Sequence, residues 1–484
     1  MAHTTAIANA DWVVGYDGAG HRLIRGGTVA FSDNTITYVG TGYAGPADTV
    51  IDGRGRVVIP GLISTHAHLT TEARNKGFLE DAGSRKLWHS GLFEYMPAMG
   101  MAAFDQEAVV DVLRFSLVEL VKSGCTAVFE LGRPTEKTLV AMEESGLRIF
   151  TGPMYRSARW HTQNGHAVHY QWDEEAGRHG LREAVDFVER HSSAWGGRLT
   201  GVLCPAQADT CTPELLRETM AAARRLDTRV QIHAAQSVSE HLEMMRRHGM
   251  TPIEFLARQG MVGPQVIIGH ALLLAHHSAI RYPDHDDLGV LAQTGTHVAH
   301  CPWVFGRRGV HMESFGGYLR RGVNVTIGTD TCPQDMMEEM RWAAVLSKNA
   351  TNDAACPTAA ETFTAATLNA ARALGREDLG RLAPGAKADV VILDGRAMTI
   401  RPLRDPVKSI VYYGASRSVE TVIVDGRVLV RGGQVLDVDE YVLAERLQGV
   451  AERTLAGVKE RDWAGRTHEQ LSPLSFPLWE GPPS

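Results

Sequence analysis

The chain has 484 residues, of which 44% are hydrophobic and 22% are charged, and its formal net charge is -7. These values are typical of a soluble globular protein that is too long for one ordinary compact domain. The charges form no long run of one sign, which argues against a nucleic-acid partner. No apolar stretch approaches the roughly 18 residues of a membrane-spanning helix, so we expect no membrane partner.

The first residues contain no basic region followed by an apolar core, so no secretory signal is visible. The cysteines are scattered, with no Cys-x-x-Cys pair, which suits reduced thiols better than a disulfide framework. We therefore expect a cytoplasmic location. The six cysteines are Cys125, Cys204, Cys211, Cys301, Cys332 and Cys356.

Short strand-like runs with turn residues between them occur near both ends of the chain. A small β domain built from both termini around an inserted middle would explain this distribution. We predict a composite β-sandwich from residues 1–58 and 386–440. The runs are residues 12–16, 28–31 and 35–39, then 389–394, 409–413, 421–424 and 427–430.

The middle of the chain alternates short apolar runs with longer helical patterns, such as residues 107–122 and 183–191. Eight such runs predict an α/β fold of the (β/α)8 TIM-barrel type over residues 59–385. Residues 441–484 are expected to form a helix and a Pro-rich tail, lying over the barrel or over a neighbouring subunit. The runs are 57–63, 127–131, 148–152, 200–204, 230–233, 266–269, 297–301 and 323–328.

His66 and His68 follow the first of these runs directly. Side chains two residues apart on an extended segment point to the same side, which at the end of a barrel strand is the mouth. With 21 histidines in the chain, such a pair is weak evidence alone.

Further polar side chains end three other runs: His233 the fifth, His270 the sixth and Asp330 the eighth. Their convergence on one rim predicts a site for one divalent metal per chain. The predicted ligands are His66, His68, His233 and Asp330. Zinc is the expected ion, with iron, manganese or cobalt as alternatives. We expect Asp330 to act as general base toward a metal-activated water, and His270 to bind that water or polarise the substrate.

Three motifs carry a resemblance over nearly the whole chain. They are residues 61–68 (Gly-Leu-Ile-Ser-Thr-His-Ala-His), 119–126 (Glu-Leu-Val-Lys-Ser-Gly-Cys-Thr) and 380–389 (Gly-Arg-Leu-Ala-Pro-Gly-Ala-Lys-Ala-Asp). This pattern resembles the amidohydrolase superfamily, which implies a barrel with a composite β-sandwich. No lysine lies between Lys137 and Lys348, so the carboxylated lysine that bridges two metals in some members has no counterpart. The chain thus resembles the mononuclear branch, which includes cytosine deaminase and the triazine, phenylurea and thiocarbamate hydrolases.

The chain departs from that branch at Gln236. Its deaminases and several of its triazine enzymes carry a glutamate three residues after the strand-five histidine, and that glutamate shuttles protons. Glutamine cannot carry a proton, so we assign Gln236 a hydrogen-bonding role at the catalytic centre. Glu240 lies too far along the chain to replace the acid. In an amide or urea, Asp330 could instead pass the water's proton to the leaving nitrogen.

Aromatic residues occupy loops that should reach the barrel mouth, including Trp303 and Phe305 where the branch has polar groups. Aromatic side chains line apolar pockets, although each of these could also lie in the core. Arg307 and Arg308 are expected on solvated faces. The predicted substrate-binding residues are Trp88, Tyr95, Tyr155, Trp160, His300, Trp303 and Phe305.

The leading expectation is a metal-dependent hydrolase that cleaves a C–N bond of an N-substituted urea, carbamate, thiocarbamate or amide. An aryl compound such as a phenylurea is the type substrate, which suggests xenobiotic degradation. One alternative is deamination or dechlorination of an s-triazine or another N-heterocycle, and another is a non-catalytic barrel. We expect a small-molecule substrate and a homo-oligomer.

Overall fold

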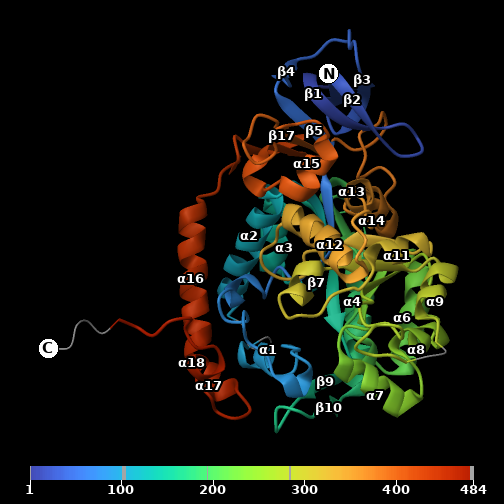
Figure 1. The fold of residues 1–484 in the computed structure, drawn as a ribbon, viewed down its shortest axis with the longest axis vertical. Coiled ribbons are helices and arrows are strands. Elements are labelled where there is room, and N and C mark those ends of the chain that lie inside the picture. Colours follow the sequence, from blue (N-terminus) through green and yellow to red (C-terminus); the bar gives the residue numbers. More distant parts are fainter. Residues whose placement is uncertain (1, 101–104, 193, 283–284, 480–484) are drawn as a thin grey trace.

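The computed structural model describes residues 2–100, 105–192, 194–282 and 285–479. A β-rich unit containing the N-terminus lies at one end of the molecule, above a larger α/β body (Figure 1). The C-terminal helix α16 runs along the side of that body.

The β-rich unit is one hydrogen-bonded sheet of nine strands from both ends of the chain. The N-terminal and C-terminal parts join where β17 pairs antiparallel with β5, with Val391 opposite Ile59. Strands from both ends of the chain thus form one continuous sheet in the order β20-β19-β18-β17-β5-β1-β2-β3, with β4 paired to β1. The strands are β1 Thr4–Tyr16, β2 His21–Ser32, β3 Thr35–Gly40, β4 Thr49–Asp52, β5 Arg56–Pro60, β17 Val390–Asp394, β18 Val419–Val424, β19 Arg427–Arg431 and β20 Gln434–Val435.

One predicted strand of this unit is wrong. Residues 409–413 form the second half of helix α15 (Pro406–Tyr413). Asp405 caps the helix by accepting hydrogen bonds from the backbone N–H groups of Val407 and Lys408, and Pro406 suits the first helical turn. Ile410 and Val411 are buried against the body, so the apolar run is the inner face of a helix.

The body contains two parallel sheets, in the orders β11-β8-β7-β6, with β12 also paired to β8, and β13-β14-β15-β16. Isolated bridges join the two sheets at both seams: Leu203 with Val230 and Gln207 with His233 on one side, and Ala67 with Asp330 on the other. The arrangement is TIM-barrel-like. The strands are β6 Leu62–Ala67, β7 Cys125–Gly132, β8 Arg148–Tyr155, β11 Leu199–Gly201, β12 Cys204–Pro205, β13 Val230–Ala234, β14 Val266–His270, β15 His297–His300 and β16 Asn324–Ile327.

The first predicted run, residues 57–63, divides between the two units. Its first part belongs to β5 of the nine-stranded sheet and its last part to β6. Gly61 stands at the break, where a Cβ atom would lie 2.0 Å from Oγ1 of Thr126. Only glycine therefore fits as the chain passes from one unit to the other.

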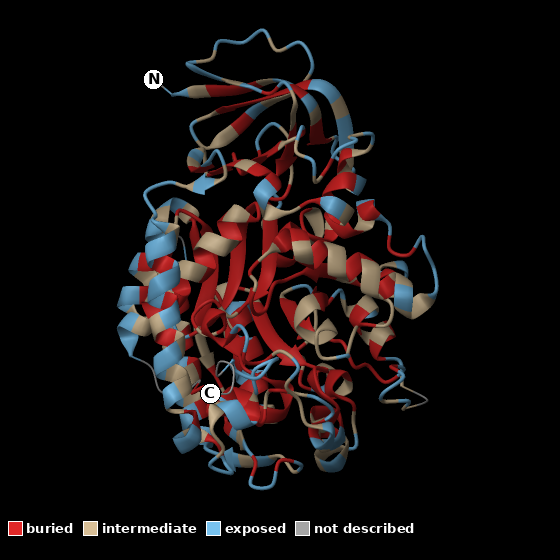
Figure 2. Cartoon of the chain, turned by 60° about the vertical axis from the view of Figure 1, so that its left-hand side comes forward, coloured by how far each residue is buried: buried red, intermediate tan, exposed pale blue. Residues whose placement is uncertain are grey.

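Helices alternate with these strands and cover them, while the strand residues are buried (Figure 2). A short hairpin, β9 (Ala158–His161) with β10 (His169–Trp172), follows β8. The larger helices of the body are α2 Gln106–Lys122, α3 Glu136–Glu144, α4 Glu174–His191, α6 Pro213–Leu226, α7 Val238–His248, α8 Pro252–Arg258, α9 Asp287–Thr294, α10 Pro302–Gly306, α11 Phe315–Arg320, α12 Met336–Thr351, α13 Ala359–Ala365 and α14 Leu368–Leu374.

The C-terminal segment confirms the predicted helix. Helix α16 (Glu440–Ala456) packs Leu447 and Val450 against Val112 of α2. Helices α17 (Val458–Arg461) and α18 (His468–Leu471) follow, and the tail then extends away from the body (Figure 1). Nowhere in the described ranges does a helix have the length and apolar character needed to cross a membrane.

Candidate active site

Four predicted metal ligands meet at the carboxyl ends of the parallel strands. The Nε2 atoms of His68 and His233 lie 3.2 Å apart. Oδ1 of Asp330 lies 3.6 Å from Nε2 of His66 and 3.6 Å from Nε2 of His68. The strand ends are clamped together, because the N–H of Asp330 donates to the carbonyl of His66 and the N–H of His68 donates to the carbonyl of Asp330.

The three histidines are oriented by hydrogen bonds at the opposite nitrogen. Nδ1 of His68 donates to the carbonyl of Leu131 at 2.8 Å, and Nδ1 of His233 donates to the carbonyl of Ala206 at 2.6 Å. Nδ1 of His66 donates to Oε1 of Gln231. Each Nε2 lone pair is therefore free to face its neighbours, as ligating histidines require.

This arrangement fits a divalent metal. Nε2 of His66 is fully buried and has no hydrogen-bond partner among the described residues, which is costly unless another group binds it. Three imidazole nitrogens and one carboxylate match the donors that zinc accepts in catalytic sites. Cys301 lies in a group with His66, His270 and Asp330 whose potential ligand atoms are within 4.8 Å of one another. Burial raises the pKa of its thiol well above the usual value, which favours the thiol over the thiolate that binds metals.

Two glycines leave room for the His66 ring. A Cβ atom on Gly269 would lie 2.7 Å from its ring atoms, and a Cβ atom on Gly328 would lie 2.7 Å from its Cβ. Sequence reasoning missed both roles, and it missed Gln231. The signal for Gln231 was its spacing, because a residue two before His233 on β13 shares the same face of the strand.

His270 faces the other oxygen of Asp330, with Nε2 at 3.6 Å from Oδ2. Burial lowers the pKa of His270 to about 3, so its imidazole is neutral at physiological pH. Burial alone would raise the pKa of Asp330, but His270 and His66 outweigh it and hold that pKa below its usual value. The pair thus combines an ionised carboxylate, which can accept a proton, with a neutral imidazole, which can form a hydrogen bond.

Gln236 lies in the turn after β13, which is held by the buried side chain of Glu240. The backbone N–H groups of Ala235 and Gln236 donate to the two carboxyl oxygens of Glu240 at 2.9 and 2.8 Å. Burial, followed by the charge of Asp209, raises the pKa of Glu240 to about 8. Glu240 therefore contacts the backbone of Gln236, and its role is to shape the turn that carries it.

Asp209 is a second buried carboxylate that sequence reasoning missed. Its Oδ2 accepts hydrogen bonds from Nε1 of Trp160 at 2.8 Å and from the hydroxyl of Tyr170 at 2.7 Å. Its Oδ1 is buried and accepts no hydrogen bond from the part of the chain that the structure describes. It lies two residues after Gln207, which bridges to His233, so the β9–β10 hairpin is anchored beside the metal ligands.

A family model for the amidohydrolase family matches residues 57–429, which include every site residue described above. The chain belongs to the amidohydrolase family. It is 32% identical to the 5'-deoxyadenosine deaminase of Methanosarcina mazei over 442 residues, covering 90% of this chain and 95% of the relative. It is 28% identical to the 5-methylthioadenosine/S-adenosylhomocysteine deaminase of Moorella thermoacetica over 426 residues, covering 86% and 92%.

Solved structures support the fold of this amidohydrolase. An adenosine deaminase from Xanthomonas campestris with bound zinc has a TM-score of 0.80 at 23% identity, with 93% of this chain and 98% of that chain covered. The atrazine chlorohydrolase of Arthrobacter aurescens TC1, complexed with zinc, has a TM-score of 0.74 at 21% identity, covering 92% and 100%. The family and its deaminase relatives make this chain a metal-dependent hydrolase of C–N bonds other than peptide bonds.

The residues predicted to contact substrate in this amidohydrolase lie in different surroundings from one another. Phe305 packs edge-on against His270, with ring centroids 4.6 Å apart, and so lies beside the metal ligands. Trp303 donates from Nε1 to the carbonyl of Cys332 and packs against Trp342 of α12. His300 stacks on Phe315, and burial lowers its pKa to about 3.

Of the remaining predicted substrate contacts, three use their side chains in contacts with other parts of the protein and one is exposed. The hydroxyl of Tyr155 bonds Oγ1 of Thr219 on α6, so this residue belongs to the core between strand and helix. Tyr95, in the short helix α1 (Tyr95–Ala98), is buried in a cluster that includes Val458 of α17. Trp88 is 45% exposed. The indole N–H of Trp160 donates a hydrogen bond to Asp209, and its ring packs against Phe93.

The expectation that Arg307 lies on a solvated face is wrong. Its side chain is only 6% exposed, pairs with Glu80 in the loop after β6, and donates to Oγ1 of Thr331 at 3.3 Å. Thr331 directly follows Asp330. Arg307 thus ties the loops after the first, seventh and eighth body strands together beside the site.

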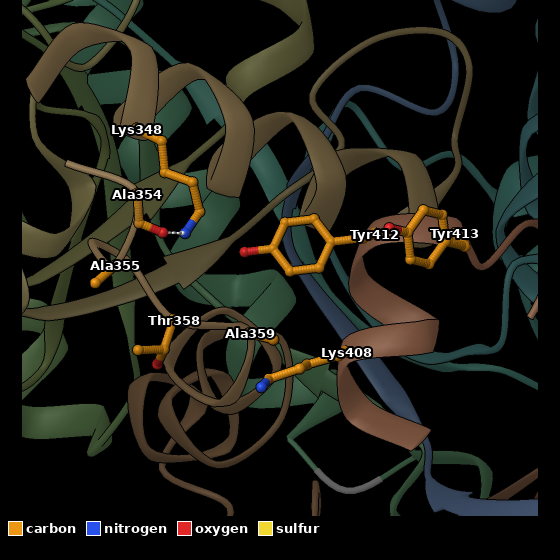
Figure 3. Close-up of a pocket in the computed structure, with 8 residues that line it drawn as sticks. All are labelled: Lys348, Ala354, Ala355, Thr358, Ala359, Lys408, Tyr412 and Tyr413. Atoms are coloured by element: carbon orange, nitrogen blue, oxygen red, sulfur yellow. Dashed lines mark hydrogen bonds between the residues drawn. The ribbon is translucent and has the colours of Figure 1, made fainter. Parts of the chain in front are cut away.

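Two cavities in the described parts of the chain lie away from the metal ligands. One, of about 500 Å³, lies between α12, α13 and α15 and is lined by Lys348, Thr358, Lys408, Tyr412 and Tyr413 (Figure 3). Its Lys348 already donates to the carbonyl of Ala354 at 2.5 Å. The other lies at the opposite ends of the body strands from the site.

Proposed function

We propose that this amidohydrolase is a deaminase that removes an amino group from a purine-like N-heterocycle, of the kind carried by 5'-deoxyadenosine. The observation that carries this proposal is the position of His270, whose Nε2 lies 3.6 Å from Oδ2 of Asp330, beside the three imidazole nitrogens of His66, His68 and His233. The 32% identity to a 5'-deoxyadenosine deaminase over 90% of the chain supports the substrate class.

The chain's own residues provide a proton route. We propose zinc as the ion for His66, His68, His233 and Asp330; when bound, such an ion lowers the pKa of a coordinated water toward neutrality. Asp330, ionised and buried, accepts the proton of the attacking water and returns it to the leaving nitrogen. His270, neutral and held by Phe305, donates or accepts a hydrogen bond at the reacting carbon's substituents.

Gln236 determines whether a ring nitrogen of the substrate receives a hydrogen bond or a proton. Its side-chain amide can donate a hydrogen bond to that nitrogen but cannot transfer a proton. The ring is then polarised rather than protonated, and one carboxylate, Asp330, carries all proton transfer. We expect this chemistry to favour rings that are already electron-poor.

A second candidate follows from the same residue. Hydrolysis of an N-substituted urea, carbamate, thiocarbamate or amide needs only one proton at the leaving nitrogen, which Asp330 supplies. Gln236 would then bind the carbonyl-bearing substrate through its amide. Under this candidate the protein acts in xenobiotic degradation, with a phenylurea as the type substrate.

The test is turnover of a matched panel by the zinc-loaded protein: 5'-deoxyadenosine, 5'-methylthioadenosine, cytosine, an s-triazine, a phenylurea and an anilide. Ammonia release from the nucleosides, lost in Asp330→Asn, supports the deaminase. Aniline release from the phenylurea or anilide without ammonia supports the second candidate. If Asp330→Asn turns over any of these as fast as the wild type, the proposed proton route is wrong.

A further inference from the structure

A cavity of about 470 Å³ lies at the amino ends of the body strands, opposite the active site. Three of its lining residues show this position. Arg229 directly precedes β13, His297 begins β15 and Asn324 begins β16, whereas the active-site residues follow the other ends of these strands. The remaining lining residues are Pro264, Gly295, Gly322, Arg372, Gly375 and Glu377.

Arg229 forms no ion pair among the described residues, although the negative charge of Asp227 acts on its cation. Nε of Arg229 is fully buried with no hydrogen-bond partner, and within the described chain its guanidinium forms no ion pair. The guanidinium lies close against Gly375, where a Cβ atom would lie 2.1 Å from Nη2. Burial lowers the pKa of Arg229, and the charge of Asp227 opposes this shift only in part. A partly buried cation that forms no ion pair favours the binding of an anion beside it.

Arg372 supplies a second cationic group to the same cavity. Nη1 of Arg372 donates to the side-chain oxygen of Asn324, a neutral acceptor, at 3.3 Å. Asn324 also donates to Nδ1 of His297 at 2.9 Å, and Nε2 of His297 donates to the carbonyl of Pro264 at 3.2 Å. These bonds occupy both ring nitrogens of His297. Its pKa is lowered to about 4, by burial first and then by Arg229, so the ring stays neutral.

The cavity therefore presents two guanidinium groups beside the neutral polar side chains of His297 and Asn324. Glu377 lines it too and is exposed, but forms an ion pair with neither arginine among the residues that the structure describes. Guanidinium groups bind phosphate and carboxylate through paired charge-assisted hydrogen bonds. We propose that this cavity binds a small oxyanion-bearing molecule, a phosphate ester or a dicarboxylate, between Arg229 and Arg372. This site is separate from the active site and does not depend on the proposed function.

The experiment is isothermal titration calorimetry, in which inorganic phosphate and, separately, malonate are titrated into the metal-loaded full chain. We expect saturable binding, weakened about tenfold or more in both Arg229→Gln and Arg372→Gln, because each removes a charge-assisted hydrogen-bond donor. Glu377→Gln should tighten binding, because it removes a competing negative charge. Arg404→Gln, which alters an exposed arginine outside the cavity lining, is the matched control and should bind as the wild type does.

Comparing Asp330→Asn with the arginine variants distinguishes binding in this cavity from binding at the metal centre, which can also bind phosphate. Binding that persists in Asp330→Asn but weakens in the arginine variants supports the proposal. Tighter binding of phosphate than malonate identifies a phosphoryl ligand, and the reverse identifies a carboxylate. The proposal is overturned if neither anion binds, if both arginine variants bind like the wild type, or if only Asp330→Asn loses binding. Arg372 is exposed, so its variant should fold even if Arg229→Gln does not.

Discussion

Gln231, on β13, bonds both to His66 and to the backbone of β6, the strand that carries His66. Its Oε1 accepts the Nδ1 hydrogen of His66, and its Nε2 donates to the carbonyl of Thr65 at 2.8 Å. The amide is thereby fixed in orientation, and it fixes the imidazole tautomer that leaves Nε2 free for a metal. Two side chains 165 positions apart in the sequence thus define one ligand.

Replacing Gln231 with leucine should therefore weaken metal binding. Outer partners of ligating histidines typically contribute about 10- to 100-fold to metal affinity, and we expect a loss in this range. Competition with a chromogenic chelator measures it. Gln259→Leu, which removes another buried glutamine far from the site, is the matched control and should keep wild-type affinity. Equal losses in both variants would mean that Gln231 acts through general stability.

The two glycines around His66 give a steric prediction. Gly269→Ala places a Cβ atom 2.7 Å from the ring of His66, and Gly328→Ala places one 2.7 Å from its Cβ, closer than real side chains approach, so His66 must shift. Metal content should fall in both, as measured by mass spectrometry on purified protein. Gly20→Ala, whose new Cβ would meet no atom closer than 3.6 Å, should retain full metal content. Normal metal content in both site variants would show that the ring has more room than its neighbours indicate.

A buried ion pair holds the body to the nine-stranded sheet. Arg148, at the start of β8, is 1% exposed and contacts Asp389 at 2.8 Å and Asp425 at 2.6 Å. Removing one partner of a buried pair leaves uncompensated charge, so Arg148→Met should lower the free energy of unfolding by about 3–5 kcal/mol. Urea unfolding measures this. Arg114→Met breaks the exposed pair with Glu144 and should cost less than about 1 kcal/mol. Similar losses in the two variants would contradict this assignment.

Glu240 should make stability depend on pH. Its pKa is raised from 4.5 to about 8, mainly by burial, so the folded protein holds a proton that the unfolded chain releases earlier. This contribution to stability is complete below 4.5 and is lost as the pH rises toward 8. Between pH 4.5 and about 8, the free energy of unfolding should therefore fall less in Glu240→Gln than in the wild type. The comparison uses this slope and not the absolute stability of either protein. Parallel pH profiles for the two proteins would mean that Glu240 does not titrate there.

Gln236→Glu tests how the leaving group is protonated. Restoring a carboxyl beside the site should raise ammonia release from adenine nucleosides, because a positioned general acid contributes about 10²–10⁴-fold. Gln236→Asn keeps an amide and is the control, with no such gain expected. Steady-state rates at saturating 5'-deoxyadenosine provide the measurement. An unchanged rate in Gln236→Glu would place residue 236 outside reach of the ring.

Much of the site could be predicted because its ligands follow strands, and strand ends can be recognised from apolar runs. His66, His233 and Asp330 were found in this way. Gln231, Gly269 and Asp209 could not, because their roles come from contacts with residues distant in the sequence. Helix α15 was mistaken for a strand because its buried face, Ile410 and Val411, is β-branched. The decisive local signal was the cap formed by Asp405 before Pro406.

The central claim is that His66, His68, His233 and Asp330 together hold one divalent ion. The most direct test is metal content by mass spectrometry of the wild type and of His233→Ala and Asp330→Asn, all checked for folding by circular dichroism. The account predicts one equivalent of metal per folded wild-type chain and a large loss in both variants. Full metal content in both folded variants, or none in an active wild type, would contradict it.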